Sequence, residues 1–236
     1  MHDTSGTAVG IALPGQPRLL GDMLDTSVRR FGSRNVLDFM GRTLTYAELG
    51  QSVDRAARGL QDLGVVKGTR VALCLPNTPY YPILFFAILK AGGIVVNVNP
   101  LYVERELAHL LEDSGATIIA TCDIAEIHAR VLKVAGQMGV KHVITCPIAG
   151  ALPPLKGLAY RLLKRAEIGR APSDARHLTF DALLSAKGTP APVAATPDEV
   201  AVLQYTGGTT GEPKADRKST RLNSSHLSQT RMPSSA

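Results

Sequence analysis

Continuous apolar runs alternate along this chain with segments in which apolar residues recur every three or four positions. The continuous runs are typical of strands covered on both faces of a parallel sheet, and they occupy residues 69–77, 94–100, 117–122, 141–146 and 200–205. The segments between them have helical spacing and occupy residues 79–93, 104–116 and 126–139. This order predicts an α/β fold with a mostly parallel sheet and flanking helices.

Two further elements are expected before the first of these runs. Apolar residues in 17–34 recur at helical spacing and predict a helix. Residues 35–46 read as a short hairpin, with Gly41 in the turn. The chain therefore opens with a helix and a hairpin that stand outside the strand–helix alternation.

The helix after this hairpin has clear start and stop signals. Thr45 and Glu48 have the S/T-x-x-E spacing in which a hydroxyl and a carboxylate each satisfy a free backbone N–H group. Its apolar residues line one face, and Gly64 suits a left-handed terminator. We therefore expect an amphipathic helix between these signals.

The pattern loosens over residues 147–196. Residues 158–170, "LAYRLLKRAEIGR", combine leucines with basic side chains at helical spacing. Such a helix either packs its leucines on the domain and solvates its charges, which we favour, or lies on an anionic membrane. Residues 187–199 are rich in Pro and Ala and read as an exposed connection. The residues that define the helix are Leu158, Arg161, Leu162, Leu163, Lys164 and Arg165.

Composition narrows the class of protein. A chain of 236 residues with 44% hydrophobic content can bury a real core. No apolar run approaches the roughly 18–20 residues of a membrane-spanning helix, and the first residues lack the pattern of a secretory signal. We expect a cytoplasmic protein and leave contact with the inner face of the membrane open. Cys74, Cys122 and Cys146 lie in apolar runs without zinc-ligand spacing, so we expect buried, reduced thiols.

The basic charge is unevenly distributed. The formal net charge is +6, and half of it lies in the last 21 residues, where four basic residues accompany Asp216. The body of the protein is therefore only weakly basic. No aromatic residue interleaves the basic residues of the tail, as stacking on bases would require. We expect no nucleic-acid partner.

The last apolar run leads into "YTGGTTGEPK", residues 205–214. Gly207 and Gly208 let the backbone turn sharply without interference from a Cβ, and successive N–H groups in such a turn form a concavity for anionic oxygens. The threonine hydroxyls and Lys214 add donors and a positive charge. The spacing is neither that of the standard phosphate-binding loop nor that of the dinucleotide fingerprint. The pattern alone leaves a phosphate site and a tight surface turn both open.

This loop resembles the phosphate-loop signature of the adenylate-forming superfamily of acyl-CoA synthetases, peptide-synthetase adenylation domains and luciferases. Upstream, "LTYAELGQSVDRAARGLQDLGVVKGTRVALCLPN" and "AILKAGGIVVNVNPLYVERELAHLLEDSGA" follow in the order and spacing of bacterial long-chain-fatty-acid CoA ligases. The resemblance covers most of residues 19–214. It implies that 18–215 is an incomplete N-terminal AMP-binding (adenylation) domain of that fold, preceded by a loose N-terminus, 1–17.

The resemblance implies a fatty acid substrate, with ATP, Mg²⁺ and coenzyme A as the other components of the full-length enzyme. It assigns the loop to the β- and γ-phosphates of ATP and assigns no catalytic or metal-binding residue in this chain, so we expect the fragment alone to be inactive. Another acyl- or aryl-acid adenylating enzyme stays open, as does a non-enzymatic nucleotide- or nucleic-acid-binding protein with a basic tail. The implied ATP-binding residues are Thr206, Gly207, Gly208, Thr209, Thr210, Gly211 and Lys214.

The resemblance stops after Lys214. The family continues there with Gly-Ala and a Thr-His pair, whereas this chain has "ADRKSTRLNSSHLSQTRMPSSA". Residues 216–236 contain six serines and no apolar period, so we expect disorder. "DRKSTRLNSSH" and "RMPSSA" resemble a translated sequencing adapter, so we expect an artefactual tail joined to a gene fragment.

The remaining polar and aromatic side chains have structural interpretations. Two histidines on helices, His109 and His128, are expected at the surface or its boundary. Four carboxylates are expected on a solvated helix face: Glu104, Glu106, Glu112 and Asp113. Two asparagines at the end of a strand, Asn97 and Asn99, are expected to form hydrogen bonds with the backbone as it leaves that strand. Four aromatic residues are expected in the core: Tyr80, Tyr81, Phe85 and Phe86.

Overall fold

The computed structural model describes residues 19–206 and 214–219. Seven strands form one sheet in the order β7-β6-β5-β3-β4-β8-β9, parallel throughout except for the antiparallel pair β8–β9. The predicted α/β fold with a mostly parallel sheet is therefore confirmed. The strands are β3 (Arg70–Cys74), β4 (Ile94–Asn97), β5 (Ile118–Cys122), β6 (His142–Cys146), β7 (His177–Thr179), β8 (Val200–Thr206) and β9 (Lys214–Ser219).

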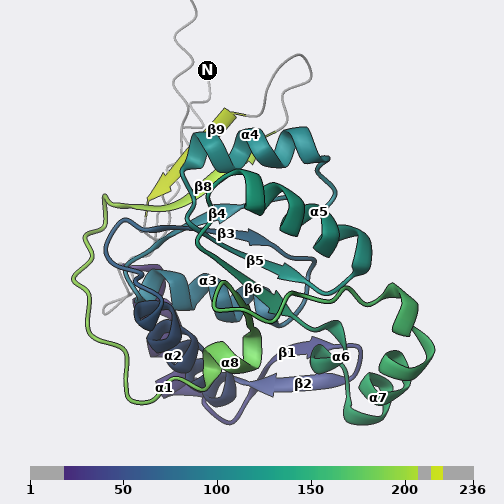
Figure 1. Ribbon diagram of the computed structural model, residues 1–236. Coiled ribbons are helices and arrows are strands. Elements are labelled where there is room, and N and C mark those ends of the chain that lie inside the picture. Colours follow the sequence, from purple (N-terminus) through teal and green to yellow (C-terminus); the bar gives the residue numbers. More distant parts are fainter. Residues whose placement is uncertain (1–18, 207–213, 220–236) are drawn as a thin grey trace, which may run out of the picture.

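Helices cover both faces of this sheet (Figure 1). On one face lie α1 (Leu20–Phe31), α2 (Tyr46–Asp62), α3 (Tyr80–Lys90) and α8 (Phe180–Leu184). On the other lie α4 (Glu104–Ser114) and α5 (Ala125–Gln137). Because successive strand residues point to opposite faces, Val71 and Leu73 of β3 pack with the first group of helices and Ala72 and Cys74 with the second.

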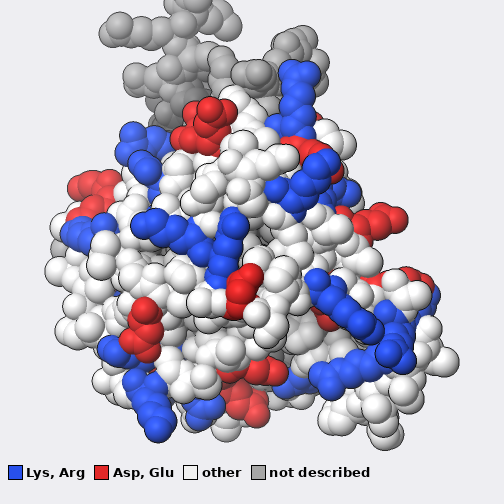
Figure 2. All heavy atoms as spheres, in the orientation of Figure 1, with Lys and Arg blue, Asp and Glu red and all other residues white. Residues whose placement is uncertain are grey.

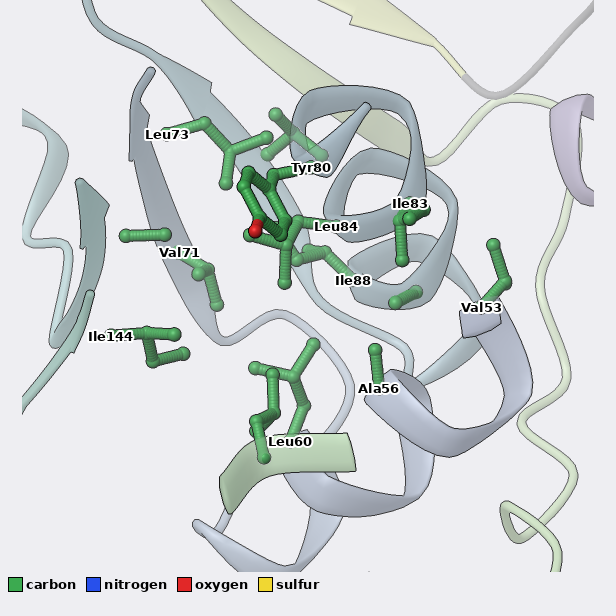
Figure 3. Packing of buried hydrophobic residues seen from close by; sticks show 14 of the residues in the cluster. Val53, Ala56, Leu60, Val71, Leu73, Tyr80, Ile83, Leu84, Ile88 and Ile144 are labelled. Carbon is green, nitrogen blue, oxygen red and sulfur yellow. The ribbon is translucent and has the colours of Figure 1, made fainter. Parts of the chain in front are cut away.

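The larger core cluster lies between α2, α3 and the sheet. Figure 3 shows Val53, Ala56 and Leu60 of α2 directed toward α3 and toward the strand residues Val71 and Ile144. These side chains are at most 1% exposed. Helix α2 starts at the predicted capping box, with Thr45 accepting from the Glu48 N–H group and Glu48 from the Thr45 N–H group. The predicted left-handed glycine after it is also present, with Gly64 at φ 86°.

A separate corner is formed by a hairpin and two helices. Strands β1 (Asn35–Phe39) and β2 (Arg42–Thr45) form the predicted hairpin around Gly41. Beside it lie α6 (Ile148–Ala151) and α7 (Pro154–Leu163), followed by the 3₁₀ turn Arg165–Glu167 (Figure 1). Arg42 donates to the carbonyl oxygen of Gly150 and ties the hairpin to α6.

The expected packing of Leu158, Leu162 and Leu163 on the domain is wrong, because these side chains of α7 are 57%, 70% and 82% exposed. The helix starts earlier than expected, at Pro154, and the side that it turns inward carries Gly157. The leucines therefore occupy its outer side.

Residues 147–196 also contain a strand and a helix near their end that were not predicted. These are β7 and α8, and Thr179 caps α8 by accepting a hydrogen bond from the N–H group of Ala182. A threonine before an apolar helical run was the available signal.

The structure also differs from the expected disorder over Asp216–Ser219, which belong to β9. Strand β9 pairs with β8, whose backbone N–H and C=O groups would otherwise form an open sheet edge. The rest of the expected tail, 220–236, and the expected loose N-terminus, 1–17, lie outside the described residues.

The expected burial of the three cysteines is confirmed. Cys74, Cys122 and Cys146 are the last residues of β3, β5 and β6, and all three are free thiols with at most 2% exposure. Burial raises the pKa of the Cys74 thiol to about 12. They are therefore unreactive side chains of the native core.

His128 was expected at the surface or its boundary, but its side chain is only 1% exposed. It shares the inner face of α5 with Val131 and Ala135, at i+3 and i+7, a spacing that would have predicted burial. Its Nε2 lies 3.1 Å from the Thr145 hydroxyl. Burial lowers the pKa of the imidazole, which the nearby Asp123 carboxylate partly opposes.

Within the two described ranges, no helix combines the length and the apolar character needed to cross a bilayer.

Candidate functional site

The glycine- and threonine-rich segment starts and ends at one edge of the sheet. Strand β8 ends at Thr206, β9 starts at Lys214, and the backbones of these two residues pair. Both residues therefore lie at the carboxyl edge of the parallel strands, and β8 is the neighbour of β4. Ligands of open α/β sheets bind along this edge.

Of the predicted phosphate-binding residues, only the backbones of Thr206 and Lys214 belong to the described part of the chain. The other five lie outside the described residues: Gly207, Gly208, Thr209, Thr210 and Gly211. Their role stays a prediction.

The connectivity of the sheet also indicates a ligand position at the carboxyl edge near β8. Strand β3 leads into α3 on one face, whereas its neighbours β4 and β5 lead into α4 and α5 on the other face (Figure 1). Connections that leave adjacent strands toward opposite faces open a crevice at the carboxyl edge. Strand β8 is separated from β3 by β4 alone, so its end lies beside the position where this rule expects a ligand.

A chain of side-chain hydrogen bonds supports the end of β8. The Tyr81 hydroxyl of α3 donates to Oδ1 of Asn97 over 2.6 Å, and Nδ2 of Asn97 donates to Oε1 of Gln204 over 2.6 Å. Gln204 lies two residues before Thr206. These part-buried contacts connect α3, β4 and β8 and fix the position from which the loop departs.

This network was not predicted. Tyr81 packs against the core as expected, but its hydroxyl also binds Asn97, which was expected to bind the departing chain. Only Asn99 fulfils the expectation, by accepting a hydrogen bond from the Leu101 N–H group. The available signal was a polar residue, Asn97 or Gln204, near the end of each of two neighbouring apolar strands.

Tyr205 anchors the same strand on the other face. Its ring is 4% exposed, and its hydroxyl donates to Oδ2 of Asp113 on α4 over 2.5 Å. Burial raises the pKa of the phenol, and the bond to Asp113 raises it further. This side chain therefore fixes the end of β8. Asp113, expected only as part of a solvated face, has this additional role.

A small cavity of about 220 Å³ lies between the hairpin and the start of α3. The Thr78 hydroxyl is buried there and has no hydrogen-bond partner in the part of the chain that the structure describes. The cavity is lined by Leu37, Asp38, Phe39, Asn77, Thr78, Pro79, Tyr81 and Pro82. It adjoins the network through Tyr81.

A larger hollow, of about 700 Å³, lies at the opposite edge of the sheet, where β4 and β8 begin. Two amines in its lining already have carboxylate partners: Lys67 pairs with Glu199 at 2.8 Å, and Lys90 pairs with Asp54 at 2.7 Å. Size alone would select this hollow, but it is at the wrong edge for the loop. We therefore place the candidate site at the carboxyl edge.

Residues 19–206 and 214–219 contain no grouping of three His, Cys, Asp or Glu side chains that could hold an ion. Near the end of β8, side-chain oxygen atoms come from the amides of Asn97 and Gln204 and from the carboxylate of Asp113.

Comparisons with known proteins agree with the fold and with the sequence pattern. A family model described as "AMP-binding enzyme" matches residues 24–216. The long-chain-fatty-acid–CoA ligase of Escherichia coli O6:H1 (strain CFT073) is 37% identical over 208 residues, which cover 85% of this chain and 36% of that protein. The ligase of the same name from Bacillus subtilis (strain 168) is 33% identical, covering 86% and 36%.

Solved structures show the same fold. The anthranilate CoA ligase AuaEII, in complex with anthranoyl-AMP, matches with a TM-score of 0.70 at 20% identity, covering 87% of this chain and 36% of that protein. A long-chain-fatty-acid-CoA ligase from Archaeoglobus fulgidus matches with a TM-score of 0.66 at 23% identity, covering 86% and 37%. The chain thus spans about a third of the length of the relatives that it matches.

Proposed function

Because this chain belongs to the family of AMP-binding enzymes, we propose that it supplies the ATP-phosphate-binding part of a fatty acid–CoA ligase. The single observation that supports this most strongly is the pairing of Thr206 with Lys214 at the carboxyl edge of the sheet. The identity of 33–37% to long-chain-fatty-acid–CoA ligases favours a fatty acid over an aryl acid as the substrate.

The proposed reaction has two steps. A fatty carboxylate oxygen attacks the α-phosphorus of ATP, which forms an acyl-adenylate and releases pyrophosphate. The thiol of coenzyme A then attacks the acyl carbon, loses its proton and releases AMP. The protein's task in the first step is to hold the triphosphate in line and to neutralise the charge that develops on the leaving oxygens.

Each part of the loop has a proposed role in that task. The backbone N–H groups of Gly207, Gly208 and Gly211 bind the β- and γ-phosphate oxygens, and Lys214 supplies a positive charge. The hydroxyls of Thr206, Thr209 and Thr210 donate to the phosphates, and Mg²⁺, which prefers oxygen ligands, would accompany the triphosphate.

The network behind the loop supports these roles. Gln204 is held by Asn97, and Tyr205 is held by Asp113, on opposite faces of β8. The end of β8 cannot shift without breaking one of these bonds. A loop that starts from a fixed strand end loses less conformational entropy when it binds a polyphosphate.

ATP binding by the 236-residue chain tests the proposal. We expect Lys214→Met to weaken the affinity for ATP–Mg²⁺ about tenfold or more, because a hydrogen bond to a charged group contributes about 1.5–3 kcal/mol. Lys218→Met is the matched control, because Lys218 lies on the same strand and pairs with Asp216 at 2.8 Å. Equal affinities of the two variants in titration calorimetry would contradict the assignment of the loop.

The substrate class needs a second measurement. We expect the 236-residue chain to form no acyl-CoA by itself, because it spans about a third of its relatives. In a protein extended to their full length, fatty acids should support ATP–pyrophosphate exchange. Exchange with benzoate or anthranilate but not with fatty acids would favour an aryl-acid enzyme and would leave the ATP site unaffected.

A further inference from the structure

Helix α7 presents an apolar surface to solvent. Its leucines Leu155, Leu158, Leu162 and Leu163 are 83%, 57%, 70% and 82% exposed. Met40, in the turn of the neighbouring β1–β2 hairpin, is 61% exposed. We call these five side chains the leucine patch. Because large apolar side chains that gather on a surface mark interaction sites, the patch needs a partner.

The outward direction of the leucines is built into the packing of α7. A Cβ on Gly157 would overlap the carbonyl oxygen of Ala149, so only glycine lets α7 approach α6 this closely. Lys156 donates to the carbonyl oxygen of Met40 over 2.8 Å and joins the helix to the hairpin turn. The helix is thus held by its glycine side, and its apolar side cannot rotate inward without losing both contacts.

Basic side chains surround the patch. Between residues 154 and 170 there are five basic residues and one acidic residue, Glu167. Glu167 pairs with Lys164 at 2.6 Å. Figure 2 shows Lys and Arg side chains gathered beside uncharged surface at the corner that α7 occupies in Figure 1. The five basic residues are Lys156, Arg161, Lys164, Arg165 and Arg170.

We propose that the leucine patch docks α7 on the surface of an anionic lipid bilayer. A helix with leucines on one side and basic residues around them lies in the membrane plane, with its apolar side at the boundary of headgroups and acyl chains. Each nearby basic residue adds attraction to anionic lipid. The mixture of apolar and positive surface matches a bilayer that is apolar inside and negative at its surface.

A second copy of the chain fits this surface less well. A stable protein interface uses about 20–30 residues on each side, whereas the patch has five side chains. Two copies facing each other through α7 would also bring together two sets of basic residues, which repel each other. The bilayer satisfies both the apolar and the charged part of the surface.

Insertion of the helix can be observed directly, because the chain contains no tryptophan. In Leu163→Trp the only indole should move into an apolar environment when vesicles of phosphatidylcholine and phosphatidylglycerol are added, with a blue-shifted emission. Leu101→Trp is the matched control, because Leu101 is 79% exposed but lies outside the patch, before α4. Its emission should stay unchanged.

Vesicle flotation measures the contribution of the patch to binding. We expect Leu158→Asn with Leu162→Asn to lower the fraction bound to anionic vesicles at least tenfold. The control, Val66→Asn with Leu101→Asn, removes two equally exposed apolar side chains elsewhere and should bind as the unmodified chain does. All four positions are exposed, so circular dichroism and the unfolding midpoint should be unchanged.

The basic residues around the leucine patch should strengthen vesicle binding in addition to the burial of its leucines. Arg165→Gln should weaken vesicle binding about fivefold at low salt, the effect of one basic residue near an anionic surface. Arg55→Gln, an exposed arginine on α2, should change it much less. Vesicles of phosphatidylcholine alone should bind weakly.

Three results would overturn the proposal. One is equal flotation of the patch variant and its control, which would assign binding to another segment, such as the basic residues beyond 216. Another is a red-shifted or unshifted indole in Leu163→Trp on vesicles that bind the chain. The last is a dimer in sedimentation that the patch variant dissociates, which would assign the leucines to a second copy.

Discussion

Helices α2 and α7 are both amphipathic, and both contact a neighbouring element through a glycine, yet they bury opposite sides. Helix α2 directs Leu60 into the core, where it is fully buried, and its Gly59 lies against Leu183 of α8. Helix α7 places Gly157 against Ala149 and leaves its leucines exposed. The comparison shows that an apolar period identifies the apolar side of a helix but does not establish which side faces the core.

The two helices also differ in what holds them. Helix α2 lies against α3 and the sheet through apolar packing. The segment that carries α6 and α7 is held at both ends by Asp123, which follows β5: its carboxylate accepts from the Ile148 N–H group, and its carbonyl oxygen accepts from the Gly169 N–H group, each over 2.7 Å. Helix α2 is therefore stabilised by burial of apolar surface, whereas α7 is held in place by a few polar contacts.

The largest expected difference between the helices is in the energetic contribution of a leucine. Leu60→Ala should lower the free energy of unfolding by about 2–5 kcal/mol, because it leaves a cavity in a packed core. Leu162→Ala should change it by less than about 0.5 kcal/mol, because that side chain already contacts solvent. Urea unfolding of both variants measures this. Similar losses would mean that α7 is packed against the protein in solution.

The next comparison concerns the two glycines through which α2 and α7 contact their neighbours. Gly59→Ala and Gly157→Ala should each lower the free energy of unfolding by about 1–3 kcal/mol, because the new methyl group meets a backbone carbonyl oxygen. Gly136→Ala, near the end of α5, meets nothing within 4 Å and should instead stabilise by up to about 1 kcal/mol through helix propensity. A stabilised Gly157→Ala would show that α7 lies farther from α6 than described here.

A smaller effect is expected at the start of α2. Thr45→Ala removes the hydroxyl that accepts from the Glu48 N–H group and should cost about 1 kcal/mol. Thr43→Ala, an exposed change in the same hairpin, should stay within about 0.5 kcal/mol. Helix α7 has no side-chain cap, so no single polar truncation at its start should have this effect.

The smallest expected effect is a pH dependence of stability in the segment that carries α7. His128 lies against Gly169, and burial lowers its pKa below the ordinary value of 6.5. Below that pH the unfolded chain binds a proton that the folded chain does not, so stability should fall as the pH decreases through about 6.5. Burial raises the pKa of the nearby Asp123 carboxyl, and His177 is a second titratable neighbour of His128. Urea midpoints of the unmodified chain and of His128→Gln at pH 7.5 and 5.5 measure the difference; an equal fall in both would exclude His128 as its source.

Much of the α2 region could be predicted from the sequence, because its signals are local. The Thr45–Glu48 spacing, the apolar side of the helix and Gly64 all act within a few residues, and the strands after it are continuous apolar runs. The α7 corner could not be predicted, because its arrangement depends on contacts distant in sequence, such as Arg42 with Gly150 and Lys156 with Met40.

The candidate site shows the same division. The glycine- and threonine-rich loop was visible as a motif, and the fold places its two ends at the edge where a ligand is expected. The support behind it, from Tyr81 through Asn97 to Gln204, spans 123 residues of sequence across three elements. No spacing rule connects residues that the sheet order alone brings together.

The buried thiols at the strand ends can be used to measure transient opening of the core. A thiol-specific disulfide reagent can reach Cys122 or Cys146 only while the helices have separated from the sheet, since both side chains are fully enclosed. The speed of modification therefore records how often the enclosed layer becomes accessible. Cys74 faces the opposite layer, next to α4 and α5, so the same reagent distinguishes loosening on one side of the sheet from loosening on the other.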